Sequence, residues 1–237
     1  MERILTGIEG LDRITAGGFP KGSSILVSGA AGTGKTILAM QFLYNGALKC
    51  NEAGLYVTFE TNPKTISWDM ESFGWDIKKL QDKNLFKIYK LNITATRPEQ
   101  VRQQIESELR IIAKMAKEIN AKRLVVDSTT AFGARLASTA ELRGFLYNFC
   151  DSLKELGCTT ILTAETRGGK NDFSAFGVEE FVVDGIVSLY FTPPNRSIFV
   201  RKLRGTNHSK RVHPFEINGK GVEVKDKDEV LWEGLGA

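Results

Sequence analysis

Short apolar runs alternate with longer helical patterns over the first two thirds of the chain. Between the runs, apolar residues recur every three or four positions, as they do in amphipathic helices. The pattern predicts strands at 24–28, 54–60, 85–91, 123–127 and 159–164. It predicts helices at 37–48, 63–73, 99–119 and 140–156. Strands that are apolar throughout and separated by helices indicate a mostly parallel sheet covered on both faces.

The last quarter of the chain follows a different pattern, in which short turns separate the strands. Strands are predicted at 186–192, 197–203, 214–217 and 222–224, with a hairpin tip at 193–196. Strands joined by turns indicate an antiparallel or mixed extension of the sheet. No Pro-rich or charged linker and no long repeat interrupts the 237 residues, so we expect one α/β domain spanning 1–237.

The segment Gly29–Thr36 has the sequence G-A-A-G-T-G-K-T, which fits the phosphate-binding P-loop pattern G-x-x-x-x-G-K-T. It lies between a predicted strand and a predicted helix, where backbone amides can surround a polyphosphate. Lys35 is expected to reach the β- and γ-phosphates, and the Thr36 hydroxyl to bind Mg²⁺. The residues expected to bind ATP here are Ala31, Gly32, Thr33, Gly34, Lys35, Thr36 and Ile37.

Two carboxylates follow predicted strands and are candidates for the rest of the site. Asp127 ends the run L-V-V-D and is expected to hold the Mg²⁺ shell, although strand-end aspartates also cap turns. Glu60 ends the run G-L-Y-V-T-F-E. Its position alone fits equally a carboxylate that orients the attacking water and an exposed strand-end side chain.

Lys202 and Arg204 lie two residues apart on a late strand, so their side chains point to the same face. Such a pair fits a solvated edge that discourages strand pairing. It fits equally a pair that reaches the γ-phosphate bound by a neighbouring subunit, as arginine fingers do. The sequence around them leaves both interpretations open.

Composition narrows the class of protein. The formal net charge is +4, which is mild for a domain built around DNA. No apolar run is long enough to span a membrane, and the N-terminus lacks the pattern of a signal peptide, so we expect a cytoplasmic protein without membrane contact. The three cysteines and two histidines form no recognisable ligand set for a structural metal.

Two glycine- or alanine-containing loops, 128–138 and 166–179, are candidates for contact with a partner. The first contains Arg135, and the second contains Arg167, Lys170, Phe173 and Phe176. Cations interleaved with aromatic rings suit a single nucleic-acid strand. Phenylalanines that pack at a subunit interface explain the same residues, and the mild charge favours that interpretation.

Taken together, these motifs resemble the KaiC-like ATPases of the RecA superfamily over nearly the full chain. The last of the segments named next is far more specific than the P-loop. The segments that carry the resemblance are Thr6–Asp12, Gly17–Gly22, Val57–Glu60, Val126–Ser128, Phe176–Phe181 and Lys202–His208, the last being K-L-R-G-T-N-H.

The resemblance implies a RecA-like P-loop fold, ATP with Mg²⁺, and homo-oligomeric rings, with a hexamer as one candidate. It implies that Glu60 orients the attacking water. It implies that Lys202 and Arg204 contact the γ-phosphate across the subunit boundary, with His208 near the same nucleotide. It places Glu165 where RecA relatives have a polar γ-phosphate sensor.

Two departures from the family pattern qualify the expected activity. Many KaiC domains have two adjacent glutamates after the V-T-F strand, and here Thr61 takes the second place. We therefore expect slow turnover. The Ser-Thr phosphoacceptors of the autokinase half align with Glu180 and Phe181 here, so no autophosphorylation is expected.

Three functions remain open at this point. The first is an ATPase that rearranges a protein or nucleic-acid partner through hydrolysis at a subunit interface. The second is a slow, nucleotide-gated assembly or signalling module, which Thr61 favours. The third is a recombinase-like ATPase that binds single-stranded DNA.

Overall fold

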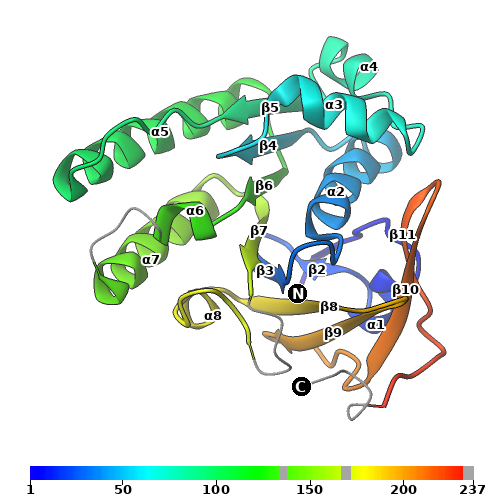
Figure 1. Cartoon of the computed structure of the whole chain (residues 1–237). Coiled ribbons are helices and arrows are strands. Elements are labelled where there is room, and N and C mark those ends of the chain that lie inside the picture. Colours follow the sequence, from blue (N-terminus) through cyan, green and yellow to red (C-terminus); the bar gives the residue numbers. More distant parts are fainter. Residues whose placement is uncertain (134–137, 167–171, 232–237) are drawn as a thin grey trace.

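The structure is a computed structural model and describes residues 1–133, 138–166 and 172–231. Its main sheet has the strand order β11-β10-β9-β8-β3-β7-β6-β4-β5 (Figure 1). The parallel strands are β3 (Ser24–Gly29), β4 (Gly54–Thr58), β5 (Phe86–Lys90), β6 (Arg123–Asp127), β7 (Thr159–Glu165) and β8 (Gly185–Thr192). Three antiparallel strands extend the sheet from β8, namely β9 (Asn195–Leu203), β10 (Val212–Asn218) and β11 (Gly221–Val224). The mixed sheet predicted from the sequence is confirmed.

Helices cover both faces of this sheet (Figure 1). The larger ones are α2 (Lys35–Cys50), α3 (Pro63–Glu71), α5 (Pro98–Glu118) and α7 (Thr139–Glu155). The shorter ones are α1 (Leu11–Ile14), α4 (Ile77–Asp82), α6 (Thr130–Gly133) and α8 (Glu179–Val182). The helix α2 lies on one face, and α5 and α7 lie on the other (Figure 1).

The pleat of the central strands divides the core into two apolar clusters. Ile25, Tyr56, Val125 and Ile161 point toward α2, and their strand neighbours point toward α5 and α7. Because successive residues of a strand face opposite sides, the continuous apolar runs of the sequence supply both clusters. At the end of each central strand, every second side chain therefore points to the face covered by α2.

Local signals fix where the helices begin. Asn62 caps α3 through its side chain, which accepts a hydrogen bond from the Lys64 amide at 2.9 Å, and Pro63 occupies the first turn. Ser138 caps α7 by accepting from the Glu141 amide at 3.2 Å. Both caps satisfy backbone donors that a helix cannot pair itself.

Some local expectations were wrong. The strand predicted at 54–60 ends at Thr58, so Glu60 lies in the following loop. The turn between β8 and β9 comprises Pro193 and Pro194, because Asn195 and Arg196 already belong to β9. The sequence pattern also missed α1, α4 and the two-stranded ribbon of β1 (Arg3–Ile4) with β2 (Phe19–Pro20).

A partly buried ion pair joins the loop after α2 to the start of β6. The Arg123 guanidinium, whose side chain is 1 % exposed, lies 2.6 Å from the Glu52 carboxylate and donates to the Phe42 carbonyl at 2.8 Å. Its Cζ also lies 4.6 Å from the centre of the Phe42 ring. The guanidinium is buried although the Glu52 side chain is 29 % exposed, so Arg123 depends on this carboxylate for its counter-charge.

We predict that Glu52→Ala lowers the free energy of unfolding by about 3 kcal/mol, because it leaves the Arg123 charge buried without a counter-ion. Glu2→Ala is the control, because Glu2 pairs with Lys21 at 2.7 Å where both side chains are exposed, and its loss should cost about 0–1 kcal/mol. Urea unfolding of both variants measures the difference. Equal costs would show that Glu52 does not neutralise a buried charge.

Candidate nucleotide-binding site

The loop between β3 and α2 has a backbone conformation suited to a polyphosphate. Gly32 and Gly34 have φ values of 77° and 99°, which side chains with a Cβ rarely adopt. A Cβ at Gly34 would also lie 2.7 Å from Cδ1 of Ile217. Since α2 begins at Lys35, the loop presents the amino end of a long helix to the site.

Lys35 lies across this loop rather than out in solvent. Its Nζ donates to the carbonyls of Gly29 at 2.8 Å and Ala30 at 3.0 Å. Burial lowers the pKa of Lys35, while the charges of Glu165 and Asp127 oppose that shift. The ammonium is thus held at the mouth of the loop, next to two carboxylates.

Three hydroxyl groups surround the Asp127 carboxylate. Its Oδ2 accepts from Thr36 Oγ1 at 2.8 Å and from the Tyr56 phenol at 2.5 Å, and its Oδ1 accepts from Thr163 Oγ1 at 2.5 Å. Thr36 comes from α2, and the other three residues point to the α2 face from β4, β6 and β7. Burial, followed by the nearby Asp127 charge, raises the pKa of Tyr56 well above its usual value, so the phenol keeps its proton.

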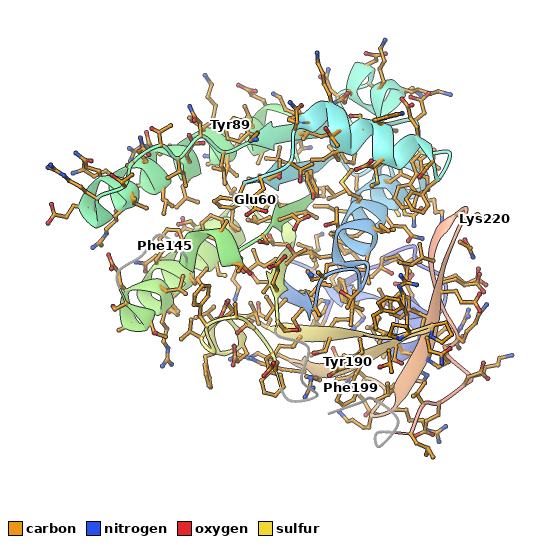
Figure 2. All side chains as sticks on the ribbon, viewed as in Figure 1. Glu60, Tyr89, Phe145, Tyr190, Phe199 and Lys220 are labelled. Atoms are coloured by element: carbon orange, nitrogen blue, oxygen red, sulfur yellow. The ribbon has the colours of Figure 1, made fainter. Side chains whose placement is uncertain are left out.

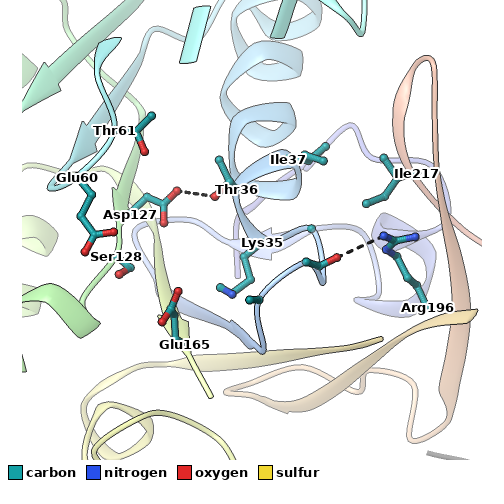
Figure 3. A pocket seen from close by; sticks show the side chains of 13 residues that line it. Lys35, Thr36, Ile37, Glu60, Thr61, Asp127, Ser128, Glu165, Arg196 and Ile217 are labelled. Carbon is teal, nitrogen blue, oxygen red and sulfur yellow. Dashed lines mark hydrogen bonds between the residues drawn. The ribbon is translucent and has the colours of Figure 1, made fainter. Parts of the chain in front are cut away.

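A cavity of about 590 Å³ joins the loop to these side chains (Figure 3). Such a volume is in the usual range for a small-molecule site. Glu60, Thr61, Asp127, Ser128 and Glu165 line one side of it, at the carboxyl ends of β4, β6 and β7. The predicted residues that line it are Ala31, Gly32, Gly34, Lys35, Thr36, Ile37, Glu60, Asp127 and Glu165.

The other side of the cavity is formed by residues that the sequence did not indicate. Arg196 of β9 and Ile217 of β10 lie there, and an Arg196 guanidinium nitrogen donates to the Gly32 carbonyl at 3.3 Å (Figure 3). The Arg196 guanidinium also lies over the Phe191 ring, 4.2 Å from its centre. Thr33 does not line the cavity, because its side chain is buried against the Ala30 carbonyl.

Lys202, Arg204 and His208 do not line this cavity. The Lys202 ammonium donates to the Val183 carbonyl at 2.7 Å and to the Glu180 carbonyl at 3.2 Å. Arg204 pairs with Asp184 at 3.5 Å, and the Lys210 ammonium lies 3.2 Å from Nε2 of the buried His208.

The register of the sheet explains this separation. The Arg204 amide donates to Asp184, and the Asp184 amide donates to Ser24 at the amino end of β3. Gly29 lies five residues further along β3, which corresponds to about 16 Å of strand. Arg204 is therefore at the opposite edge of the sheet from the P-loop of its own chain.

The donor set suits a hard divalent cation. Mg²⁺ prefers carboxylate and hydroxyl oxygens and usually retains several waters, and Thr36 and Asp127 present such oxygens beside the loop and the cavity. Neither Asp127 oxygen is engaged by a cation of the described protein, since its hydrogen-bond donors there are neutral hydroxyls. The negative charge thus remains available.

Comparison with known proteins places the chain in a family. The family model described as "ATPase: KaiC" matches residues 4–229. The chain belongs to the KaiC family of ATPases. The family supports ATP binding and ATPase activity in general, and its members typically use nucleotide with Mg²⁺.

Two archaeal relatives match this chain over nearly its full length. UPF0273 protein PH0284 of Pyrococcus horikoshii is 38 % identical, and the match covers 98 % of this chain and 97 % of that one. The crystal structure of KaiC-like protein PH0186 from the same organism has a TM-score of 0.83 and 37 % identity, covering 94 % of this chain and 98 % of that one. The RecA-like α/β fold predicted from the sequence is confirmed.

The circadian clock oscillator protein KaiC is a longer relative. The protein from Synechococcus elongatus is 36 % identical over 94 % of this chain, and the match covers 44 % of that protein. This KaiC-family chain thus spans less than half the length of the clock relatives it matches.

Parts of the two loops predicted to contact a partner, 128–138 and 166–179, lie outside the described residues. Arg135, Arg167 and Lys170 are among the residues outside the described ranges. The Phe173 ring packs against the Arg201 guanidinium, with Cζ 4.3 Å from the ring centre.

Among the described residues, we find no helix with the length and apolar character needed to traverse a bilayer.

We predict that Lys35→Ala weakens ATP binding by about 10- to 100-fold, since it removes a charged donor from the phosphate loop. Lys49→Ala is the matched control on the same helix, because Lys49 is exposed and donates to the Gly7 carbonyl at 3.1 Å, away from the cavity. Isothermal titration calorimetry with ATP measures both. Unchanged affinity in the Lys35 variant would exclude this loop as the phosphate site.

Proposed function

We propose that this chain binds ATP with Mg²⁺ and hydrolyses it at the interface between two copies of the chain. The observation that carries the proposal is the opposed placement of two groups. Lys35, Thr36, Asp127 and Glu60 meet at the carboxyl edge of the parallel strands. The Lys202–Arg204 pair lies at the other edge.

Within one copy, the loop amides and Lys35 would hold the phosphates, and Thr36 with Asp127 would hold Mg²⁺. When bound, the metal would neutralise charge on the β- and γ-phosphates. Glu60 orients the attacking water from the loop after β4 and accepts its proton. The Lys90 ammonium donates to the Glu60 carbonyl at 2.8 Å, which steadies that loop.

The neighbouring copy supplies positive charge to the γ-phosphate through Lys202 and Arg204. In the described chain Lys202 donates to the carbonyls of Glu180 and Val183, and Arg204 pairs with Asp184, which are contacts that a stronger anion can displace. Arginine-finger contacts of this kind raise the rate by about 10³–10⁵. We infer that ring-shaped homo-oligomers are the active form, with His208 at the same boundary and Glu165 sensing the γ-phosphate.

One sheet contains strands from both halves of the chain, and the family match covers residues 4–229, so we propose a single ATPase domain. The energy of hydrolysis would drive rearrangement of a protein partner. A second candidate is a nucleotide-gated assembly module with slow turnover. Thr61 favours it, because it lines the cavity beside Glu60 with a neutral side chain.

We predict that Glu60→Gln lowers kcat for ATP hydrolysis at least about 100-fold, because the amide cannot accept a proton from water. The amide has the same shape as the carboxylate, so ATP affinity should change little. Phosphate release and calorimetry measure the two quantities. Glu71→Gln, an exposed change on the following helix α3, is the control, and hydrolysis at the parental rate in the Glu60 variant would remove Glu60 from the mechanism.

We predict that two inactive variants restore activity when their subunits are mixed. Lys35→Ala lacks the phosphate grip but keeps its cations, and Arg204→Ala lacks a cation but keeps its grip. In randomly mixed rings about a quarter of the interfaces combine the two intact halves. ATPase assays of the mixture should recover about that fraction of parental activity. A mixture as inactive as its components would place Arg204 outside the neighbouring site.

A further inference from the structure

A buried tyrosine contacts the carboxylate that is proposed to hold the metal. Tyr56 of β4 is 1 % exposed, and its phenol donates to Oδ2 of Asp127 at 2.5 Å. The same oxygen accepts the hydroxyl proton of Thr36 at 2.8 Å. The strand alternation brings this phenol to the α2 face, two residues before Thr58, the register partner of Asp127.

The hydrogen bond from Tyr56 to Asp127 also affects Thr36, because both hydroxyls donate to the same carboxylate oxygen. Its hydroxyl proton is directed at Asp127, so the lone pairs of Oγ1 are left for a cation. Where that proton points depends on where Oδ2 lies. Thr163 fixes Oδ1 at 2.5 Å and Tyr56 fixes Oδ2, so the carboxylate is held from both ends.

The Tyr56 ring can hold this position because it is part of the core. It belongs to the apolar cluster beneath α2, together with Leu38, Phe42 and Val125. A different rotamer of a fully buried ring would require that cluster to open. The phenol oxygen is thus a rigid donor from the sheet, whereas Thr36 belongs to the helix that follows the phosphate loop.

We propose that Tyr56 is a positioning residue for the magnesium site: its phenol holds the Asp127 carboxylate so that Thr36 presents its oxygen to the metal. This inference rests on the proposed use of Mg²⁺. It goes beyond that function because it gives a core residue a role in metal affinity. That role is separate from binding the nucleotide itself.

The chain contains a matched control. Tyr89 of β5 donates to the Glu108 carboxylate at 2.6 Å, so it makes the same kind of hydrogen bond. Tyr89 packs on the α5 side of the sheet (Figure 2), and it does not line the cavity. Tyr56→Phe and Tyr89→Phe therefore remove equivalent groups from opposite faces.

The experiment measures Mn²⁺ binding by electron paramagnetic resonance with full-length protein and a non-hydrolysable ATP analogue. We expect Tyr56→Phe to weaken Mn²⁺ binding by about tenfold, as loss of a group that orients a metal ligand does. Tyr89→Phe should leave the Mn²⁺ affinity within about twofold of the parental value. Analogue affinity in EDTA should be unchanged in both, because neither tyrosine lines the cavity.

Several outcomes would overturn the inference. Removing a donor makes a carboxylate more basic, so equal or tighter Mn²⁺ binding by Tyr56→Phe would show that charge, not orientation, governs the site. Equal weakening in both variants would show a general effect on the fold. If the parental protein binds the analogue but no Mn²⁺, the magnesium part of the proposed function fails together with this inference.

A second variant decides the case in which Tyr56→Phe does not fold. Thr163→Val removes the donor to the other carboxylate oxygen with little change in shape, and it should also weaken Mn²⁺ binding. Unchanged Mn²⁺ affinity in that variant would show that Asp127 does not depend on its hydroxyl donors.

Discussion

The alignment of parallel strands is the constraint on which the site depends. From β8 to β5 every neighbouring pair is parallel, so the carboxyl ends of β3, β7, β6 and β4 meet at one edge. Residues far apart in the sequence, such as Lys35, Asp127 and Glu60, thereby line one cavity. The backbone hydrogen bonds of the sheet fix that edge, and a shift of one residue would turn each side chain to the opposite face.

The reversal of chain direction at β9 adds a second consequence. Arg196, at the start of this antiparallel strand, reaches the phosphate loop, whereas Lys202 near its end and Arg204 just after it lie at the far edge. One strand thus carries positive charge to both edges of the sheet. Rings of such chains offer a direct way for the far edge to serve a nucleotide, because each copy would present it to the next copy.

The sequence predicted a mostly parallel sheet with an antiparallel or mixed extension, and it predicted most of the residues that line the cavity. The P-loop and the run before Asp127 are local patterns in which a strand, a loop and a side chain are adjacent in the sequence. Tyr56, Thr163, Arg196 and Ile217 were missed because their positions depend on register between distant strands. Alternation shows which residues share a face within 54–60 and within 159–164, but only the pairing of the strands shows that Tyr56 and Thr163 lie on the same face as Asp127.

Asp127 and Glu52 are both carboxylates near buried groups, but they have different partners. Glu52 is neutralised by Arg123, which suits a contact that joins the loop after α2 to β6. Asp127 receives hydrogen bonds from three neutral hydroxyls, which orient the carboxylate without cancelling its charge. The Lys35 ammonium is close enough to interact electrostatically with Asp127, but its hydrogen bonds go to the carbonyls of its own loop. A carboxylate fixed by neutral hydroxyls, with only the nearby Lys35 charge to balance it, keeps its oxygens suited to a divalent cation, and this supports the proposed magnesium site.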